Sequence, residues 1–308
     1  MTYRTTTVTT PPEPGTPPRW ARSPWVRLPV MFLLMLVAYV LGQNVWYLVV
    51  DVNPVLGLVT GLVLAVAVLW AYRGLTTWLE RRRRPDELAL GRAAAGLGWG
   101  ALLGFTLMSV VIGTIFLLGG YRVTGTGSIP GAVAMFGLMW FVGAGEELIF
   151  RGAVFRLVEE RAGTWPALLV SAVFFGAIHL LNPGATLWGA LAIAIEAGVL
   201  LGALYVTTRS LWPVIGLHFA WNFAESSIFG ADVSGGSATD TVWTGVFDGP
   251  TLLTGGEFGP EASLVAIVVC LVPAVVLLVV AHRRGRFVQA ARRRRFTART
   301  TRHTPADG

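Results

Sequence analysis

Long apolar stretches, separated by short polar ones, make up most of this chain. Eight of them reach about 18 residues, the length with which a helix crosses the ~30 Å hydrocarbon core of a membrane. Lipid cannot satisfy backbone amides and carbonyls, so stretches of this length must be helical. The fold class that we predict is all-α, a polytopic membrane bundle of about eight helices at residues 28–50, 54–72, 99–119, 131–158, 165–181, 185–206, 211–229 and 263–281.

The composition agrees with a membrane bundle. Hydrophobic residues make up 54% of the chain and charged residues only 13%, against about 25% charged residues in soluble domains. We predict three regions. Residues 1–24, rich in Thr and Pro, form a disordered cytoplasmic tail. Residues 25–282 form the transmembrane bundle, and residues 283–308 form a basic cytoplasmic tail.

The formal net charge is +7, and the chain contains no lysine. Its arginines cluster just outside the apolar stretches, which indicates membrane topology and lipid contact rather than nucleic-acid binding. With eight spans both termini lie on one side, and that side holds the Arg-rich segments, Arg81–Arg84 and Arg292–Arg295 among them. The positive-inside rule therefore places both termini in the cytoplasm, in a multi-pass protein of the cell membrane. The opposite side includes the Gly-rich loop 230–261, which we expect to be a flexible connection.

Three pairs of glycines lie four residues apart, a spacing that lets helices approach closely. They are Gly57/Gly61, Gly100/Gly104 and Gly198/Gly202. A chain with 37 glycines also contains such pairs by chance, so the spacing alone decides little.

Ionisable side chains inside membrane spans are costly and usually functional. Three spans of this chain carry a dense set of polar side chains: Glu146, Glu147 and Arg151 in the fourth, His179 after Phe175 in the fifth, and His218 and Asn222 in the seventh. Because residues four apart share a helix face, Glu147 can pair with Arg151, and His218 lies beside Asn222. Glu146 is rotated by about 100° and meets a different neighbour.

Depth in the membrane adds a condition. These groups reach a common depth only if the fourth span continues as helix past Arg151 to about Glu159. We therefore predict that Arg151 lies within the bilayer, paired to a glutamate. The other glutamate is then left to face a reaction centre.

Two hydrolytic chemistries fit this set of side chains. A carboxylate helped by a histidine can take a proton from water, and an imidazole or amide can stabilise the resulting oxyanion. Alternatively, Glu146, His179 and His218 can hold a zinc ion with an open position for water. No HExxH zinc signature is present, and no serine within a span has a convincing histidine partner.

The ordered motifs EExxxR, FxxxH and HxxxN on three spans resemble the CPBP family. That family includes type II CAAX prenyl endopeptidases and bacterial bacteriocin-processing or self-immunity proteins. The resemblance covers about residues 131–229, and the segment Glu146–Gly152 reads EELIFRG, as in many bacterial members. It implies an intramembrane endopeptidase in which Glu146 and His179 activate water, and in which His218 and Asn222 support the oxyanion. Members are commonly named metalloproteases, so the resemblance leaves the use of zinc open.

The partners that we expect are the lipid bilayer and a membrane-embedded or membrane-associated peptide or protein substrate. Protein prenylation is largely eukaryotic, whereas the Arg-only basic residues and the EELIFRG segment have a bacterial character. We therefore expect a bacteriocin leader, a signal peptide or a membrane-anchored regulator as the substrate.

Two other functions stay open. One is a proton- or ion-coupled transporter that also uses the intramembrane acids Glu196 and Glu225. The other is a non-catalytic immunity or scaffold protein.

Overall fold

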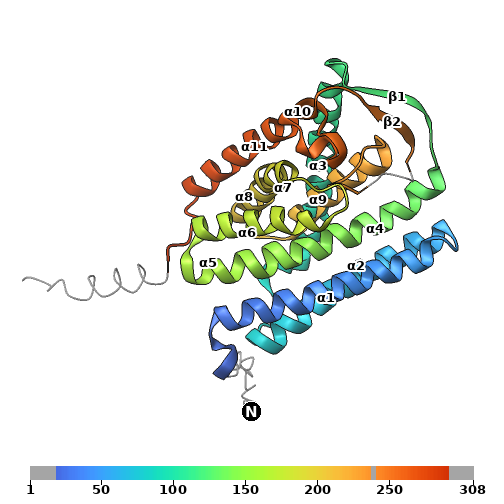
Figure 1. Ribbon diagram of the computed structural model, residues 1–308. Coiled ribbons are helices and arrows are strands. Elements are labelled where there is room, and N and C mark those ends of the chain that lie inside the picture. The colour runs from blue at the N-terminus through green and yellow to red at the C-terminus, as the bar shows by residue number, and fades with distance from the viewer. Residues whose placement is uncertain (1–18, 237–240, 291–308) are drawn as a thin grey trace, which may run out of the picture.

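The computed structural model describes residues 19–236 and 241–290 (Figure 1). Most of the two tails predicted at residues 1–24 and 283–308 lies outside these ranges. Within them, the α-helices are α1 (Pro24–Val50), α2 (Pro54–Glu80), α3 (Ala93–Leu117), α4 (Ile129–Glu147), α5 (Arg156–Ala162), α6 (Thr164–Ile178), α7 (Leu187–Ile193), α8 (Val199–Thr208), α9 (Trp212–Phe223), α10 (Thr251–Thr254) and α11 (Leu264–Arg283).

Shorter elements connect or extend these helices. The 3₁₀ turns are η1 (Arg19–Arg22), η2 (Asp86–Leu88), η3 (Leu90–Arg92), η5 (His179–Leu181), η8 (Gly256–Phe258) and η9 (Pro260–Ala262). The π-helical segments are η4 (Leu148–Phe155), η6 (Ala194–Gly198) and η7 (Ala224–Ile228). Two antiparallel strands, β1 (Tyr121–Thr126) and β2 (Trp243–Phe247), form a small sheet at one end of the bundle.

The predicted all-α polytopic bundle is confirmed. Within residues 19–236 and 241–290, seven helices are long and apolar enough to cross a membrane. The stretch expected at 211–229 is also helical, with the 12 residues of α9 running directly into the 5 of η7. It is shorter than the other spans, and almost all of its side chains are buried. The candidate site therefore lies on a helix shielded from lipid by its neighbours.

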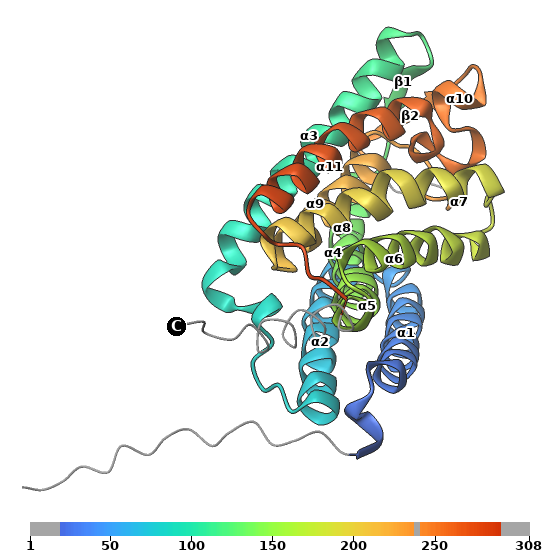
Figure 2. The same ribbon diagram turned by 90° about the vertical axis from the view of Figure 1, so that its left-hand side faces the viewer.

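The helices form two groups around the long central α4 (Figure 1). On one side, α2 packs along α4 and α1 packs beside α2. On the other side, α9 packs against α4 and α3, while α8 packs against α11 (Figure 2). The outer faces of α1, α2, α3 and α11 expose large apolar side chains such as Leu48, Val63, Phe116 and Val272. Such a surface is suited to lipid.

One of the glycine pairs brings α3 close to the helix that carries His218. A Cβ atom added to Gly100 would lie 2.2 Å from the carbonyl oxygen of Pro213, and one added to Gly104 would lie 2.2 Å from that of Leu217. Only glycine permits this backbone approach. The spacing of Gly100 and Gly104 thus lets α3 pack directly against α9, the helix that carries His218.

The prediction that the fourth span continues beyond Arg151 is confirmed. Segments α4, η4 and α5 form one helix of 34 residues, Ile129–Ala162. The π-helical geometry of η4 begins directly after Glu147 and includes Arg151. Insertions of this kind are rare in helices and frequent at functional sites.

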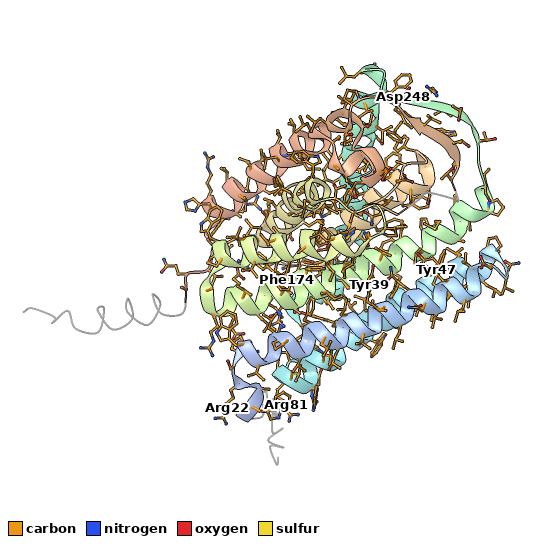
Figure 3. All side chains as sticks on the ribbon, in the orientation of Figure 1. Arg22, Tyr39, Tyr47, Arg81, Phe174 and Asp248 are labelled. Atoms are coloured by element: carbon orange, nitrogen blue, oxygen red, sulfur yellow. The ribbon has the colours of Figure 1, made fainter. Side chains whose placement is uncertain are left out.

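The Arg-rich ends of several helices meet at one end of the bundle. Arg27 at the start of α1 contacts Glu160 near the end of α5 at 2.8 Å, and Thr164 donates its backbone N–H to Val288 just beyond α11. Figure 3 shows Arg22 and Arg81 at this end and Asp248 at the opposite one. The start of α1 and the end of α11 therefore lie on the same side, as the arrangement of arginines predicts. That this side is cytoplasmic stays a prediction.

Two buried carboxylates, Glu80 and Glu87, form an ion-pair network at this end. Glu80 contacts Arg27 at 3.2 Å, Arg82 at 3.3 Å and Arg156 at 2.8 Å. Glu87 contacts Arg82 at 2.5 Å and Arg156 at 3.5 Å. Arg82 belongs to the run interpreted as a topology and lipid signal, and its side chain joins Glu80 at the end of α2 to Glu87 in η2. Arg156 connects the same two carboxylates to α5.

The network makes a pH-dependent contribution to stability. Burial raises the pKa of Glu87, but hydrogen bonds from Arg82 and the charge of Arg156 outweigh it and lower the pKa below its ordinary value of 4.5. A carboxyl with a depressed pKa stabilises the folded state above that ordinary value, and the contribution is lost as the pH falls toward the folded pKa. Glu87→Gln should therefore lower the melting temperature at pH 7, and the difference should shrink below about pH 4.5.

Thermal unfolding in detergent between pH 7 and pH 3.5 measures this effect. The control is Asp86→Asn, which removes the neighbouring exposed carboxylate. A Glu87→Gln deficit that is the same at every pH would contradict the assignment.

Candidate active site

The Glu147 side chain is fully buried and joins two of the three motifs. Its Oε1 accepts hydrogen bonds from Arg151 Nη1 at 2.8 Å and from His218 Nδ1 at 2.8 Å. The pairing with Arg151 four residues along the helix is the predicted one. The contact with His218 sets the imidazole's orientation, because a carboxylate paired to a guanidinium accepts the Nδ1 proton and leaves Nε2 facing outward.

Glu146 faces a different neighbour, as its rotation on the helix predicts. Its Oε1 accepts a hydrogen bond from the Tyr39 hydroxyl of α1 at 2.7 Å. Its Oε2 has no hydrogen-bond partner among the described residues and lies 3.8 Å from His218 Nε2. The carboxylate is therefore held through one oxygen, and the other is free for a water molecule.

Tyr39 is a site residue that sequence reasoning missed. It lies in the apolar stretch of α1, 107 residues before its partner, and its ring would meet a Cβ added to Gly145 at 2.6 Å. Gln43 donates a hydrogen bond to the same hydroxyl at 3.2 Å. Figure 3 places Tyr39 midway along α1, next to α4. An isolated tyrosine in an apolar run gives no signal in the sequence.

Removing this hydroxyl should slow turnover without unfolding the protein. Tyr39→Phe keeps the ring that packs on Phe141 and loses the donor to Glu146. A hydrogen bond to a charged group contributes roughly 1.5–3 kcal/mol, so we expect kcat for peptide cleavage to fall at least about tenfold with KM and melting temperature little changed. The control is Tyr47→Phe, an exposed tyrosine on the same helix. Equal kcat for the two variants would refute a positioning role for Tyr39.

Phe175 and His179 come from the end of α6. His179 Nδ1 lies 2.6 Å from the Phe175 carbonyl oxygen. A carbonyl only accepts, so Nδ1 carries the proton and the neutral ring presents Nε2 as an acceptor. The Phe175 ring packs against both imidazoles, with centroids 4.8 Å from that of His179 and 5.9 Å from that of His218. The aromatic residue of FxxxH therefore does more than fill the core.

Arg151 is fully buried and connects three elements. Besides pairing with Glu147, its Nη2 donates to the carbonyl oxygens of Ala197 at 3.2 Å and Gly198 at 3.1 Å in η6. Its guanidinium lies 4.7 Å from the centroid of the Phe175 ring, at the distance of a cation–π contact. Arg151 thus fixes the relative positions of Glu147, Phe175 and the π-helical segment η6.

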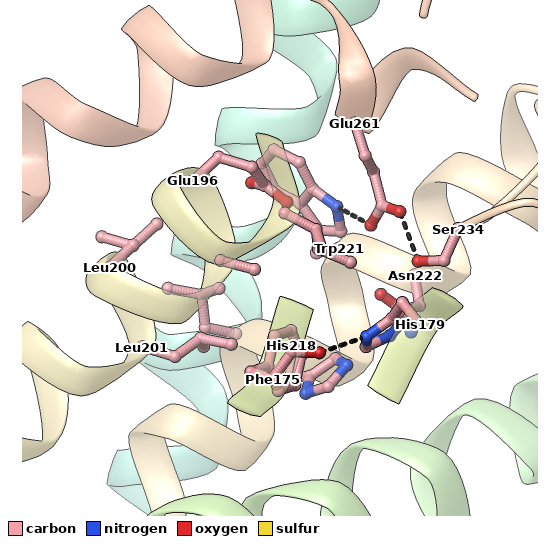
Figure 4. A pocket seen from close by; sticks show the side chains of 13 residues that line it. Phe175, His179, Glu196, Leu200, Leu201, His218, Trp221, Asn222, Ser234 and Glu261 are labelled. Carbon is pink, nitrogen blue, oxygen red and sulfur yellow. Dashed lines mark hydrogen bonds between the residues drawn. The ribbon is translucent and has the colours of Figure 1, made fainter. Parts of the chain in front are cut away.

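A pocket brings together four of the predicted residues. Phe175, His179, His218 and Asn222 line it (Figure 4). Glu146 does not line the pocket and meets it through His218 Nε2. That Glu146 and His179 together activate water, as the resemblance implies, stays a prediction.

The zinc alternative can be tested on the same geometry. Within the described ranges, no three His, Cys, Asp or Glu side chains are arranged to hold a metal ion. Glu146, His179 and His218 are not grouped around one point, although each imidazole bonds through Nδ1 and keeps Nε2 available. As they stand, these residues do not fit a three-ligand zinc site.

The loop expected to be a flexible connection contributes to the pocket. Ser234 and Glu261 lie within residues 230–261, and both are buried pocket residues. Glu196 of η6 also lines the pocket, whereas Glu225 is buried outside it. A Gly- and Ser-rich composition predicts a mobile connection. The sequence therefore gives no indication that Ser234 and Glu261 point into the pocket.

Comparison with known proteins gives one match. The family model described as type II CAAX prenyl endopeptidase Rce1-like matches residues 127–224, from the start of α4 to the end of α9. No curated protein and no solved structure matches the chain. The matched segment contains all three motifs. This match over residues 127–224 supports the similarity to CPBP-family intramembrane proteases that the motifs predict.

Proposed function

We propose that this chain hydrolyses peptide bonds of membrane-associated substrates with a water molecule activated by Glu146. The observation that carries the proposal is the free Oε2 of Glu146, which faces the outward nitrogen of His218 while Tyr39 holds Oε1. A carboxylate fixed in this way can take a proton from water with little loss of orientation.

The proposed reaction begins when Glu146 Oε2 takes a proton from water and the water oxygen attacks the scissile carbonyl carbon. The carbonyl oxygen becomes an oxyanion, which accepts hydrogen bonds from the Asn222 amide and from protonated His218 Nε2. Glu147 stabilises the charge on His218 through Nδ1. Glu146 then passes its proton to the amide nitrogen as the C–N bond breaks, giving a carboxylic acid and an amine.

His179 has its own place in this proposal. Its Nδ1–H is held by the Phe175 carbonyl, so its Nε2 is directed as an acceptor at the pocket that it lines. It can orient the water through a second hydrogen bond.

We place the chain in the cell membrane, with both termini and the Arg-rich end of the bundle in the cytoplasm.

The test is purified protein in lipid vesicles with a library of membrane-spanning peptides, with new termini identified by mass spectrometry. We expect defined cleavage products with protein and none with empty vesicles. A proton- or ion-coupled transporter would instead move ions across the same vesicles without cleaving any peptide. An immunity or scaffold protein would do neither. Metal analysis of the same sample determines whether the purified protein carries zinc.

A further inference from the structure

One side of the pocket is acidic. Glu196 from η6 and Glu261 from η9 line it together with Trp221, on the side away from Phe175 and His218 (Figure 4). Neither glutamate belongs to the three motifs. His179, His218 and Asn222 therefore share one cavity with two carboxylates, and Glu146 adjoins it through His218.

Glu261 is fixed in place by two donors. Trp221 Nε1 donates to Oε1 at 3.0 Å, and Ser234 Oγ donates to Oε2 at 2.5 Å. The residue is 2% exposed. These partners hold both oxygens of the carboxylate beside the cavity without supplying a positive charge.

One carboxylate oxygen of Glu196 is buried without a hydrogen-bond partner. It is 1% exposed, and its Oε1 has no hydrogen-bond partner among the described residues. A third buried glutamate, Glu225, lies close enough to interact electrostatically with both Glu196 and Glu261. Within the described ranges, Glu196 has one hydrogen-bond partner, the Cys270 thiol, which leaves Oε1 unpaired. A buried polar atom without a partner is costly, so this oxygen beside the cavity favours a ligand that donates hydrogen bonds and carries a positive charge.

The pocket supplies no such charge next to Glu196. Among the described residues that line it there is no arginine, the chain has no lysine, and His218 directs its charge toward Glu146 and Glu147. Arg151, which contacts the lining residue Phe175, is already paired with Glu147. The same cavity is lined by Leu200 and Leu201, whose side chains can pack against the aliphatic part of a long basic side chain.

We propose that the acidic side of this pocket is a subsite for a lysine or arginine side chain of the substrate, next to the peptide bond that is cut. The cationic head would contact Glu196 and Glu261, and the aliphatic stem would lie along Leu200 and Leu201. This inference rests on the proposed function, because it names the class of substrate residue that the hydrolytic pocket accepts.

The test uses two membrane-spanning peptides that differ only in one residue flanking the cut site, lysine in one and norleucine in the other. We expect wild-type protein to show a kcat/KM at least about tenfold higher for the lysine peptide. Glu196→Gln and Glu261→Gln should each bring the ratio of the two values toward one. The control is Glu257→Gln, which removes an exposed glutamate outside the pocket and should keep the wild-type ratio. Equal cleavage of both peptides by wild type, or an unchanged ratio in both pocket variants, would overturn the subsite.

A binding measurement separates this inference from the proposed function. Affinity for the same two peptides is measured on Glu146→Gln protein and on Glu146→Gln/Glu196→Gln protein. We expect the lysine peptide to bind at least about tenfold more tightly to the first protein and no more tightly than the norleucine peptide to the second. Absence of cleavage by wild type together with this binding pattern would reject the hydrolytic function and keep the subsite. Equal affinities for the two peptides on the first protein would reject the subsite.

Discussion

Arg151→Met is expected to destabilise the bundle by about 3–5 kcal/mol, the range for removing one partner of a buried ion pair. The change leaves Glu147 fully buried without its guanidinium. It also removes the donors to the carbonyls of Ala197 and Gly198 and the contact with the Phe175 ring. Chemical or thermal unfolding in detergent measures the loss. The control is Arg92→Met, which removes an exposed arginine.

A double variant separates the cost of leaving Glu147 charged and unpaired from the loss of the other Arg151 contacts. Glu147→Gln/Arg151→Met removes both members of the pair, so we expect it to recover part of the stability that Arg151→Met loses. Peptide cleavage should stay lost, because an amide in place of the Glu147 carboxylate cannot stabilise a protonated His218. Single-variant stability equal to that of wild type would contradict the role assigned to Arg151.

Glu146→Gln is expected to lower kcat for peptide cleavage by about 10³, within the range of 10²–10⁴ for general acid–base catalysis. The amide has nearly the same shape as the carboxylate, and its oxygen can still accept the hydrogen bond from Tyr39. The melting temperature should therefore stay close to that of wild type. Initial rates and thermal unfolding on the same preparation check both statements. Activity within tenfold of wild type would remove Glu146 from the reaction.

Several features of the fold could be predicted because they depend on local spacing. The length of the apolar runs predicts the spans, and the four-residue separation of Glu147 and Arg151 predicts their pairing on one helix face. The arrangement of arginines predicts that α1 starts and α11 ends on the same side. The ordered motifs predict the family that the model match supports.

Other features depend on which helices become neighbours, and the sequence carries little information about that. Tyr39 reaches Glu146 only because α1 packs beside α4. Glu261 enters the pocket through a Gly-rich loop whose composition indicates mobility. Arg151, Glu196 and Glu225 lie in π-helical segments, and the hydrophobic periodicity of the sequence does not predict where such segments occur.

The sequence also does not reveal that the seventh apolar stretch, residues 211–229, is enclosed by other helices. An apolar run shows only that a segment avoids water, and protein neighbours satisfy this as well as lipid does. Residues of α9 are surrounded by α3, α4 and α8, so the run that carries His218 belongs to the protein core. This burial keeps the candidate site away from lipid.

The central claim is that Glu146 activates water for peptide-bond hydrolysis in the membrane. The most direct test reconstitutes wild type and Glu146→Gln in identical vesicles with one membrane-spanning peptide from the library and identifies new peptide termini by mass spectrometry. The structure predicts a single defined cleavage with wild type and none above background with Glu146→Gln. Equal amounts of the same product with both proteins would contradict the claim.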